Sequence, residues 1–292
     1  MRKQNYLNNK DMLKEIHKSK LSYCYVLDDE YSRFDTIVES IDDIKLPEVI
    51  QTAKENRARQ LSTQAYETAY LEWYDNSSRK QSQKPKQINF KIDPNTIEEK
   101  SLVFRLMTYD HIPLEPGRKN KPKTTADHHS KCNFPPFKHY AYINDDIKEC
   151  LRSHWEGGLD NGKFNTQHGK ITNNLAKMYI KLCERYSMRS NWRGYTYVDE
   201  MRSHALLQLS QIGLQFNELK SENPFAYYTA AVTNSFTRVL NLEKRNQNIR
   251  DDLLQEAGQM PSWTRQIEHE MAERAKWDEK ADKERKEHGY NV

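Results

Sequence analysis

The chain has 292 residues, enough for one large domain or two modest ones, and its net charge of +4 does not by itself demand a nucleic-acid partner. Hydrophobic residues make up 36% of it and charged residues 30%, so any core is economical. The four cysteines are widely spaced, no run reaches the roughly 18 apolar residues of a membrane span, and the first residues lack an apolar signal core. We therefore expect a reduced, cytoplasmic protein with no membrane partner.

The first 74 residues mix helix and strand patterns. Residues 4–18 predict a short helix capped by Asn8 or Asn9, because an Asn side chain accepts a hydrogen bond from a free backbone N–H at the helix start. Alternating and β-branched residues in 21–40 indicate one or two strands. Residues 47–74 predict a long helix that begins at a proline, which suits a first helical turn.

The middle of the chain is interrupted by polar and glycine-rich stretches. Residues 75–88 read as a linker, and a strand is predicted within 101–108. Residues 113–139 form a basic loop punctuated by prolines, and 145–155 predict a short helix. The stretch 157–169 holds four glycines, so we place a domain boundary there. Everything after it has helical patterning.

Zinc-capable side chains gather in the basic loop, at Asp127 and at His128, His129, Cys132 and His139. Their spacing matches no common structural zinc pattern, so we expect histidines that contact phosphate or protein, with zinc as the alternative. No nucleotide-binding loop, metalloprotease motif or nucleophile elbow occurs. No nucleophile, base and orienting group combine, so neither an enzyme nor a cofactor is expected.

Residues 223–247 predict a helix with two faces, capped by Asn223 and with Pro224 in its first turn. One face is apolar and belongs in a core: Phe225, Tyr228, Val232, Phe236, Val239 and Leu240. A second stripe, also spaced by three and four, changes from aromatic to polar to cationic: Tyr227, Ala231, Asn234, Arg238, Asn241 and Arg245. The stripe is either an ordinary solvated surface or a nucleic-acid-reading face, because bases stack on aromatic rings and Asn and Arg reach base edges.

Three domains follow from these patterns, in a mainly α fold. Residues 1–156 form an α+β appendage, 157–250 a helical domain, and 251–292 a charged helical tail. The tail carries eleven acids against seven bases, a net charge of −4, so the rest of the chain carries +8. The basic character is therefore more concentrated than the overall charge suggests.

The helical domain has a recognisable order: a helix at 171–186, a polar joint, a helix over 198–217 ending in a Phe, a short loop, and the helix at 223. This order resembles region two of the bacterial sigma-factor family. It looks most like the late-transcription sigma factors of tailed bacteriophages, especially cyanophages, whose start is also similar to residues 5–17. Residues 25–150 then look like an insertion in an α+β appendage.

Two features depart from that resemblance. The short phage relatives end in a hydrophobic segment that engages polymerase and the sliding clamp, and this chain ends in a charged one. No helix-turn-helix for a −35 element is recognisable, so promoter reading should rest on the −10 side.

The resemblance implies a sigma factor that binds the host RNA polymerase core and melts a −10-type late promoter element in the cytoplasm of the infected bacterium. A phage co-activator or the sliding clamp remains open as a further partner. The alternative is a phage nucleic-acid-binding regulator that acts without polymerase.

The resemblance also assigns roles to residues. Tyr227 or Tyr228 would capture a flipped base, and the other DNA contacts would be Asn234, Thr237, Arg238, Lys244, Arg245 and Arg250. The coiled coil of the polymerase largest subunit would meet Asp199, Glu200, Ser203, His204, Gln208 and Gln211. The basic loop would reach DNA upstream of the −10 element through Arg118, Lys119, Lys121 and Lys123.

Overall fold

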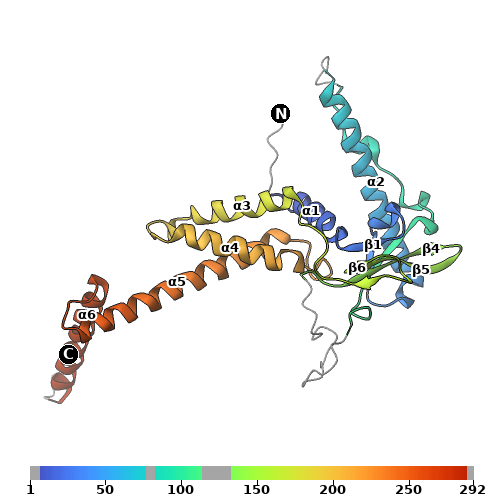
Figure 1. Cartoon of the computed structure of the whole chain (residues 1–292). Coiled ribbons are helices and arrows are strands. Elements are labelled where there is room, and N and C mark those ends of the chain that lie inside the picture. Colours follow the sequence, from blue (N-terminus) through green and yellow to red (C-terminus); the bar gives the residue numbers. More distant parts are fainter. Residues whose placement is uncertain (1–6, 77–82, 114–132, 288–292) are drawn as a thin grey trace.

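The computed structural model describes residues 7–76, 83–113 and 133–287. In these residues the protein is mainly helical, with six α-helices and a five-stranded sheet. The sheet and the long helix α2 lie at one side, and the bundle of α3, α4 and α5 lies beside them (Figure 1). Helix α5 continues out of the bundle and carries α6 at its far end (Figure 1).

The sheet contains the strands β1 (Cys24–Val26), β2 (Thr36–Val38), β3 (Val103–Met107), β4 (Phe137–Ile143) and β5 (Asp146–Ser153), in the order β1-β5-β4-β3-β2. Strand β2 pairs parallel with β3, and the other pairs are antiparallel. The strands predicted within 21–40 and 101–108 are confirmed. Short 3-10 turns lie at Asp29–Ser32, Asp42–Lys45, Gln87–Phe90, Pro94–Thr96, Glu99–Ser101, Ser190–Trp192 and Gly213–Gln215.

The helix predicted at 145–155 is wrong, because this segment is the second arm of a β-hairpin. Asn144 and Asp145 turn the chain with φ values of 54° and 66°. These left-handed values are ones that Asn and Asp tolerate better than most residues, and they are typical of tight hairpin turns. Ile143 then pairs with Asp146, and the ladder continues along β5.

Helix α1 (Asn9–Leu21) begins as predicted, with the Asn8 side chain accepting from the backbone N–H of Lys10. Helix α2 (Pro47–Asp75) matches its prediction to within one residue and begins at the proline. Its first half packs on the sheet around a small core: Val38, Ile44, Ala53, Leu102, Phe104 and Leu106.

The glycine-rich stretch is a small hairpin and not a boundary between separate cores. Strands β6 (Trp155–Glu156) and β7 (Lys163–Phe164) pair across it. A Cβ at Gly162 would collide with the Gly158 carbonyl and the Trp155 ring, so the turn requires glycine there. One hydrophobic core continues from α1 and the sheet into the helices on either side of residue 157: Met12, Ile16, Phe137 and Leu151 cluster with Leu175, Met178, Leu209 and Tyr228.

The helical part consists of α3 (Asn173–Ser187), α4 (Val198–Ile212), α5 (Pro224–Glu256) and α6 (Trp263–Glu287). The predicted inward residues of α3 are buried, namely Leu175, Met178, Tyr179 and Leu182. On α4 the core takes Leu206, whereas Leu207 is 56% exposed. Asn223 caps α5 as predicted, but the helix runs into the predicted tail as far as Glu256.

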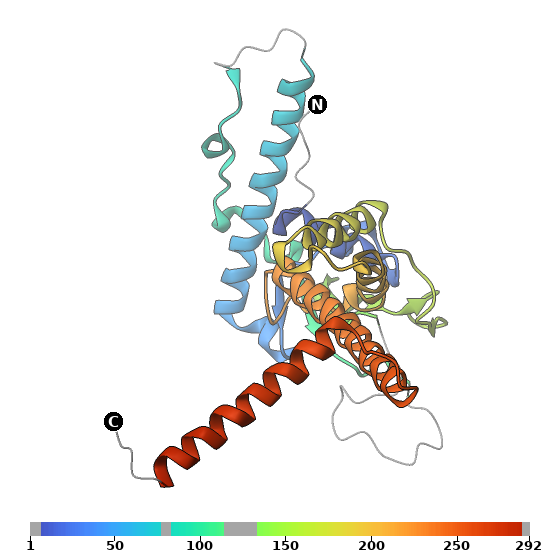
Figure 2. The ribbon, with the colours of Figure 1, turned by 90° about the vertical axis from the view of Figure 1, so that its left-hand side faces the viewer.

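A hydrogen-bonded corner joins α5 to α6. The carboxylate of Asp251 accepts from the backbone N–H of Ser262 at 2.9 Å and from its hydroxyl at 2.7 Å. Arg265 donates to Asp252 at 2.8 Å. Helix α6 therefore leaves the corner in a fixed direction, at an angle to α5 (Figure 2).

A buried ionic cluster ties α1 and the sheet to the loop before α5. The Nζ of Lys20 lies 2.7 and 2.8 Å from the two carboxylate oxygens of Glu218 and 2.7 Å from the Phe216 carbonyl. The Nη1 of Arg105 lies 3.6 Å from Glu218. Burial lowers the pKa of Lys20 to about 8 and that of Arg105 to about 10, although Glu218 opposes both shifts. Two buried cations thus share one carboxylate.

A buried histidine sits in strained backbone at the end of β5. His154 has a φ of 53°, and its ring stacks on Phe134 at 3.8 Å between centroids. Neither of its nitrogens has a hydrogen-bond partner. Burial lowers the pKa of His154 to about 3, with His111 and His168 adding to the shift. Burial likewise lowers the pKa of His111 to about 4, with the charges of Lys138 and Arg152 contributing.

We expect acid to destabilise the protein through His111 and His154. A histidine in the unfolded chain has a pKa of about 6.5. Below that pH the unfolded chain therefore binds protons at these two positions that the folded chain does not bind. The contribution of each neutral histidine to the free energy of unfolding is therefore complete above about pH 6.5. It is lost as the pH falls toward the folded-state pKa values, about 4 for His111 and about 3 for His154. Urea unfolding at pH 5 should give a free energy lower than at pH 7.5 by about 2 kcal/mol for each histidine.

Substitution separates this effect from general acid denaturation. His154→Asn should reduce the loss between pH 7.5 and 5, since Asn does not titrate and tolerates the left-handed backbone. His269→Asn, on the exposed face of α6, should leave the pH dependence unchanged. Equal pH dependence in all three proteins would contradict the assignment.

Candidate nucleic-acid interface

The outer face of α5 is polar and cationic over several turns. Its inner face buries Tyr228, Val232, Phe236 and Val239 completely or nearly so. The side chains of the outer face are exposed: Asn234, Thr237, Arg238, Asn241, Lys244 and Arg245. Among the described residues, no carboxylate lies within ion-pair distance of Arg238, Lys244 or Arg245. The charge of this face is therefore uncompensated locally.

Arg250 does not share that face. It follows Arg245 by five residues, which is about 140° round an α-helix. It also neighbours the corner residue Asp251, whose pKa is lowered chiefly by its hydrogen bonds to Ser262 and also by the charges of Arg265 and Arg250. Arg250 is exposed, but a ligand lying along the outer face would not meet it.

Tyr228 cannot stack on DNA in this fold, and that part of the prediction is wrong. Its side chain has no accessible surface. Its hydroxyl donates to the Gly213 carbonyl at 2.8 Å and lies 3.2 Å from the Tyr179 hydroxyl. The ring fills the core between α3 and α5, because Tyr228 lies at the centre of the apolar face of α5.

Tyr227 is half-buried and keeps part of its ring accessible. Its hydroxyl donates to the Ile212 carbonyl at 3.2 Å, and its ring packs against Phe216 with centroids 5.6 Å apart. Burial raises the pKa of Tyr227. The ring is thus held near the end of α4 and is only partly accessible.

A small pocket lies between α3 and the first turns of α5, which the sequence does not predict. It has a volume of 210 Å³ and is lined by Leu7, Leu182, Arg185, Tyr186, Arg189, Phe225 and Thr229. Phe225 is 36% exposed, and the buried hydroxyl of Thr229 has no hydrogen-bond partner. The Arg189 guanidinium stacks over the Tyr186 ring at 4.4 Å. The pocket combines an accessible ring, an unsatisfied hydroxyl and two cations.

Periodicity assigned Phe225 to the core face, and this is why the sequence missed the pocket. Phe225 has the correct spacing for that face, but it lies in the first turn of α5 and remains partly accessible. Tyr227 follows it by two positions, which is about 200° round the helix. The two accessible rings therefore lie on opposite flanks of α5.

The outer face of α4 carries the residues predicted to meet polymerase. Five of them are exposed, namely Asp199, Glu200, Ser203, His204 and Gln211, and Gln208 is partly exposed. Only weak local contacts hold them, such as Arg202–Asp199 at 3.4 Å and His204–Glu200 at 3.8 Å. Leu207 lies among them on the same helix. The face is thus a polar rim around one exposed apolar side chain.

The cluster that would be the alternative zinc site lies only partly within the described residues, and its one described histidine has other partners. His139 is buried in β4, where its Nε2 accepts from Arg105 at 2.9 Å and its Nδ1 lies 2.9 Å from the Tyr31 carbonyl. Burial, followed by the charge of Arg105, lowers its pKa well below the usual value. The alternative that His139 is a zinc ligand is therefore wrong, and its contacts are with protein.

The remaining residues of the cluster lie outside the described part of the chain: Asp127, His128, His129 and Cys132. The basic residues Arg118, Lys119, Lys121 and Lys123 also lie outside it. Within the described residues, no group of three or more His, Cys, Asp or Glu side chains is arranged to hold a metal ion.

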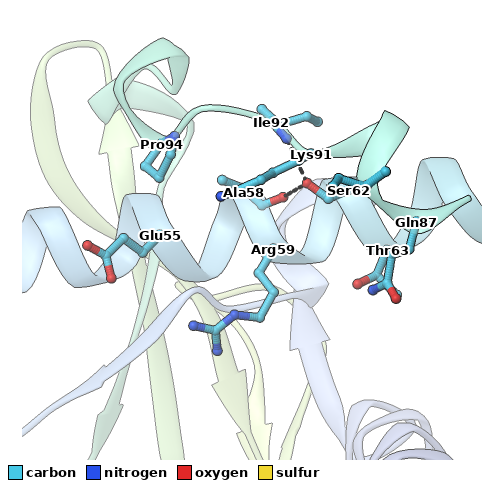
Figure 3. A pocket seen from close by; sticks show the side chains of 10 residues that line it. Glu55, Ala58, Arg59, Ser62, Thr63, Gln87, Lys91, Ile92 and Pro94 are labelled. Carbon is cyan, nitrogen blue, oxygen red and sulfur yellow. Dashed lines mark hydrogen bonds between the residues drawn. The ribbon is translucent and has the colours of Figure 1, made fainter.

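An open groove of 510 Å³ lies between α2 and the segment at 87–94. Ser62 bridges its floor, donating to the Ala58 carbonyl at 2.6 Å and accepting from the Ile92 N–H at 3.0 Å (Figure 3). Arg59 extends away from Ile92 and Pro94 (Figure 3). No lining side chain has a buried polar atom without a partner, so the groove offers no evident recognition chemistry.

Neither protein-family models nor curated proteins nor solved structures give a match to this chain. No helix in the described ranges is long and apolar enough to cross a membrane. Function is therefore inferred from the surfaces of α3, α4 and α5.

Proposed function

We propose that the protein is a phage-encoded sigma factor, which binds the host RNA polymerase core and recognises and melts a −10-type late promoter element. It acts in the cytoplasm of the infected bacterium, and the polymerase supplies the chemistry. The observation that carries the proposal is the outer face of α5, where Arg238 and Arg245 are exposed beside Asn234 and the partly accessible ring of Tyr227 precedes them on the same stripe.

Promoter melting needs groups that hold an unpaired base. Taking a base out of the stack requires a few kcal/mol, and stacking on an aromatic side chain returns about 1–3 kcal/mol per base. Phe225 and Tyr227 are the accessible rings near the start of α5. Phe225 is the better candidate, because its pocket adds the Thr229 hydroxyl and the cations of Arg185 and Arg189.

Duplex DNA would lie further along α5. Asn and Arg side chains read base edges in the major groove, and Lys and Arg neutralise phosphates. Asn234, Thr237 and Arg238 follow the rings by about two to three and a half helical turns, and Lys244 and Arg245 come next. The melted base would then lie at the start of α5, against Tyr227 on the same stripe or against Phe225 on the opposite flank, and the adjoining duplex would lie along the outer face.

The outer face of α4 supports polymerase binding. Protein interfaces are strongest where an apolar side chain is surrounded by polar contacts that exclude water. Leu207 provides the apolar centre, and Glu200, His204 and Gln211 belong to the rim. A nucleic-acid-binding regulator that acts without polymerase is the second candidate, since it would use the same face of α5 but would have no use for this face of α4.

Core polymerase supplied with the purified protein should initiate specifically on AT-rich phage late promoters. Leu207→Glu should abolish most of that initiation and weaken capture of the protein by core enzyme, because it puts a charge at the apolar centre of the interface. Run-off transcription and a pull-down with core enzyme measure the two effects.

Leu71→Glu is the matched control, because Leu71 is also exposed on a helix, at 59%, but lies on α2. It should initiate normally. A protein that never raises initiation above core enzyme alone on any phage late promoter, with or without a phage co-activator or clamp, is not a sigma factor. Normal core binding by Leu207→Glu would instead move the polymerase interface away from α4.

A further inference from the structure

The apolar spacing of α5 continues beyond the helical bundle. Inside the bundle, buried residues recur at intervals of four, three and four positions: Tyr228, Val232, Ser235 and Val239. The same alternation goes on where α5 extends out of the bundle (Figure 1), and we call these residues the distal stripe: Leu242, Asn246, Ile249 and Leu253. A pattern that fills a core is therefore present on a part of the helix that lies outside it.

The distal stripe is exposed, and the corner to α6 lies on the other side of α5. The three apolar residues of the stripe are 48–59% exposed. The corner is attached to α5 through Gln247 and Asp251, which both bond to Ser262. These two attachment residues lie about 140° and 180° round the helix from Leu242. The corner therefore lies opposite the stripe and leaves room for a second helix on it.

Charged residues border the distal stripe on both edges. The first edge carries Glu243 and, seven residues later, Arg250, and the second edge carries Arg245 and then Asp252. Glu243 is partly exposed and the other three are exposed, although Asp252 also accepts from Arg265 at 2.8 Å. Side chains at these positions face a second helix across an apolar seam, where opposite charges set the choice of partner and its direction. Each edge thus holds one acid and one base, in opposite order.

An antiparallel second copy of the chain covers the stripe in a single register. Setting Leu242 of one copy against Leu253 of the other also sets Ile249 against Asn246. The overlap from 242 to 253 is about 18 Å long. In this register Val239, the last buried hydrophobic residue of α5, falls opposite the last residue of the same helix in the other copy. The overlap therefore takes up the free part of α5 and ends where each bundle begins.

The same register pairs opposite charges along both edges. Glu243 of one copy faces Arg250 of the other along the first edge. Along the second edge, Arg245 faces Asp252 in the same way. Two-fold symmetry repeats both pairs, so four contacts between opposite charges form. Parallel pairing in register instead sets Arg245 against Arg250 of the other copy, and these two cations repel each other.

The charges of the edges favour a second copy over other occupants of the stripe. Nucleic acid laid along it would bring phosphates to the carboxylates of Glu243 and Asp252 and to apolar side chains, which offer phosphate no favourable contact. A helix of another protein would need the same apolar spacing and the same order of charges. This chain supplies both to itself, because the charge order is self-complementary under a two-fold rotation.

We propose that two copies of the protein pair antiparallel through the distal stripe. This pairing goes beyond the proposed function, since it needs neither polymerase nor promoter. The overlap is short and Asn246 interrupts it, so the association is weak and rises with protein concentration. Arg245 belongs both to the second edge and to the outer face of α5, so pairing and DNA binding compete for this arginine.

Sedimentation equilibrium of the full chain in reducing buffer measures the association. The average mass should rise from that of one chain toward that of two as the protein concentration increases. Leu253→Glu should abolish this rise, because it sets a carboxylate against Leu242 of the other copy. Leu71→Glu is the matched control, because Leu71 is equally exposed, at 59%, but lies on α2. It should associate as the unchanged protein does.

Exchange of charges tests the direction of the pairing. Arg250→Glu should weaken dimerisation roughly tenfold, because both equivalent contacts with Glu243 change from attraction to repulsion. Glu243→Arg should weaken it by a similar factor. An equimolar mixture of the two single variants should dimerise like the unchanged protein, because one chain then supplies two acids and the other two bases. The double variant should also dimerise, and this rescue excludes misfolding as the cause.

A protein that stays monomeric at every concentration overturns the proposal, and so does a dimer that Leu253→Glu leaves intact. Stronger association of Arg250→Glu would show parallel pairing, in which the new acid meets Arg245, and would overturn the antiparallel arrangement. Failure of the mixed single variants to associate would overturn it as well. None of these outcomes depends on initiation by core polymerase, so the sigma assignment is decided separately.

Discussion

Glu218→Gln should lower the free energy of unfolding by about 3–5 kcal/mol, because it leaves two buried cations without a counter-charge. Lys20 is 0% exposed and Arg105 is 1% exposed, and Glu218 is the carboxylate with which both pair. Burial alone would raise the pKa of Glu218, but these cations, with the Nε2 of His17 at 3.3 Å, hold it well below its usual range. Denaturant unfolding at neutral pH measures the loss.

The cluster also predicts an asymmetry between its members. Lys20→Met removes one cation and leaves Arg105 with Glu218, so it should destabilise less than Glu218→Gln, although the Phe216 carbonyl loses its donor. Glu222→Gln, an exposed change in the same loop, should alter stability by less than about 0.5 kcal/mol. If Glu218→Gln behaves like Glu222→Gln, the cluster is open to water and does not hold the loop before α5.

Phe225→Ala should impair promoter melting far more than initial binding. Closed complexes form mainly through phosphate contacts, which this change leaves alone. Open complexes lose a stacking partner worth about 1–3 kcal/mol, which is a factor of about 5 to 150 in the opening equilibrium. Permanganate reactivity of −10 thymines, measured beside gel-shift affinity, separates the two steps. A template with the −10 bases already unpaired should recover part of the defect.

Phe225→Tyr is the matched control, because it keeps the ring and should melt promoters normally. Tyr227→Ala tests the ring on the opposite flank of α5, and only the ring that holds the base should give the melting defect. Arg245→Ala should weaken closed and open complexes alike, since a phosphate contact exists in both. Normal melting by both ring variants would leave Asn234 and Arg238 as the only DNA-reading side chains on α5.

Secondary structure followed from the sequence wherever local chemistry was sufficient. Asn8 and Asn223 mark helix starts, because their side chains satisfy free N–H groups within the same turn. The spacing of apolar residues predicted the buried side of α3 correctly. The same reasoning failed at 145–155, because a hairpin depends on the partner strand β4 as well as on the residues of β5.

Tertiary structure decided which side chains remain available for function. Periodicity placed Tyr228 and Phe225 on one face of the helix, and packing buried the first while leaving the second accessible. The glycines after residue 156 suggested a boundary, yet a single core crosses it, because α1 returns its apolar side to the helices. By its residue type alone, His139 was a possible metal ligand. In the fold, β3 pairs with β4, and His139 accepts a hydrogen bond from Arg105.

The sequence by itself therefore determined the helices, the strands before residue 108 and the polar stripe of α5 from Asn234 onward, whereas Ala231 of the predicted stripe is buried in the core. These depend on residues within a few turns of one another. The pocket beside Phe225, the exposure of Leu207 and the Glu218 cluster each need segments from different parts of the chain to meet. The exposure of a side chain depends on these tertiary contacts, because it is covered by neighbours in space and only sometimes by neighbours in sequence.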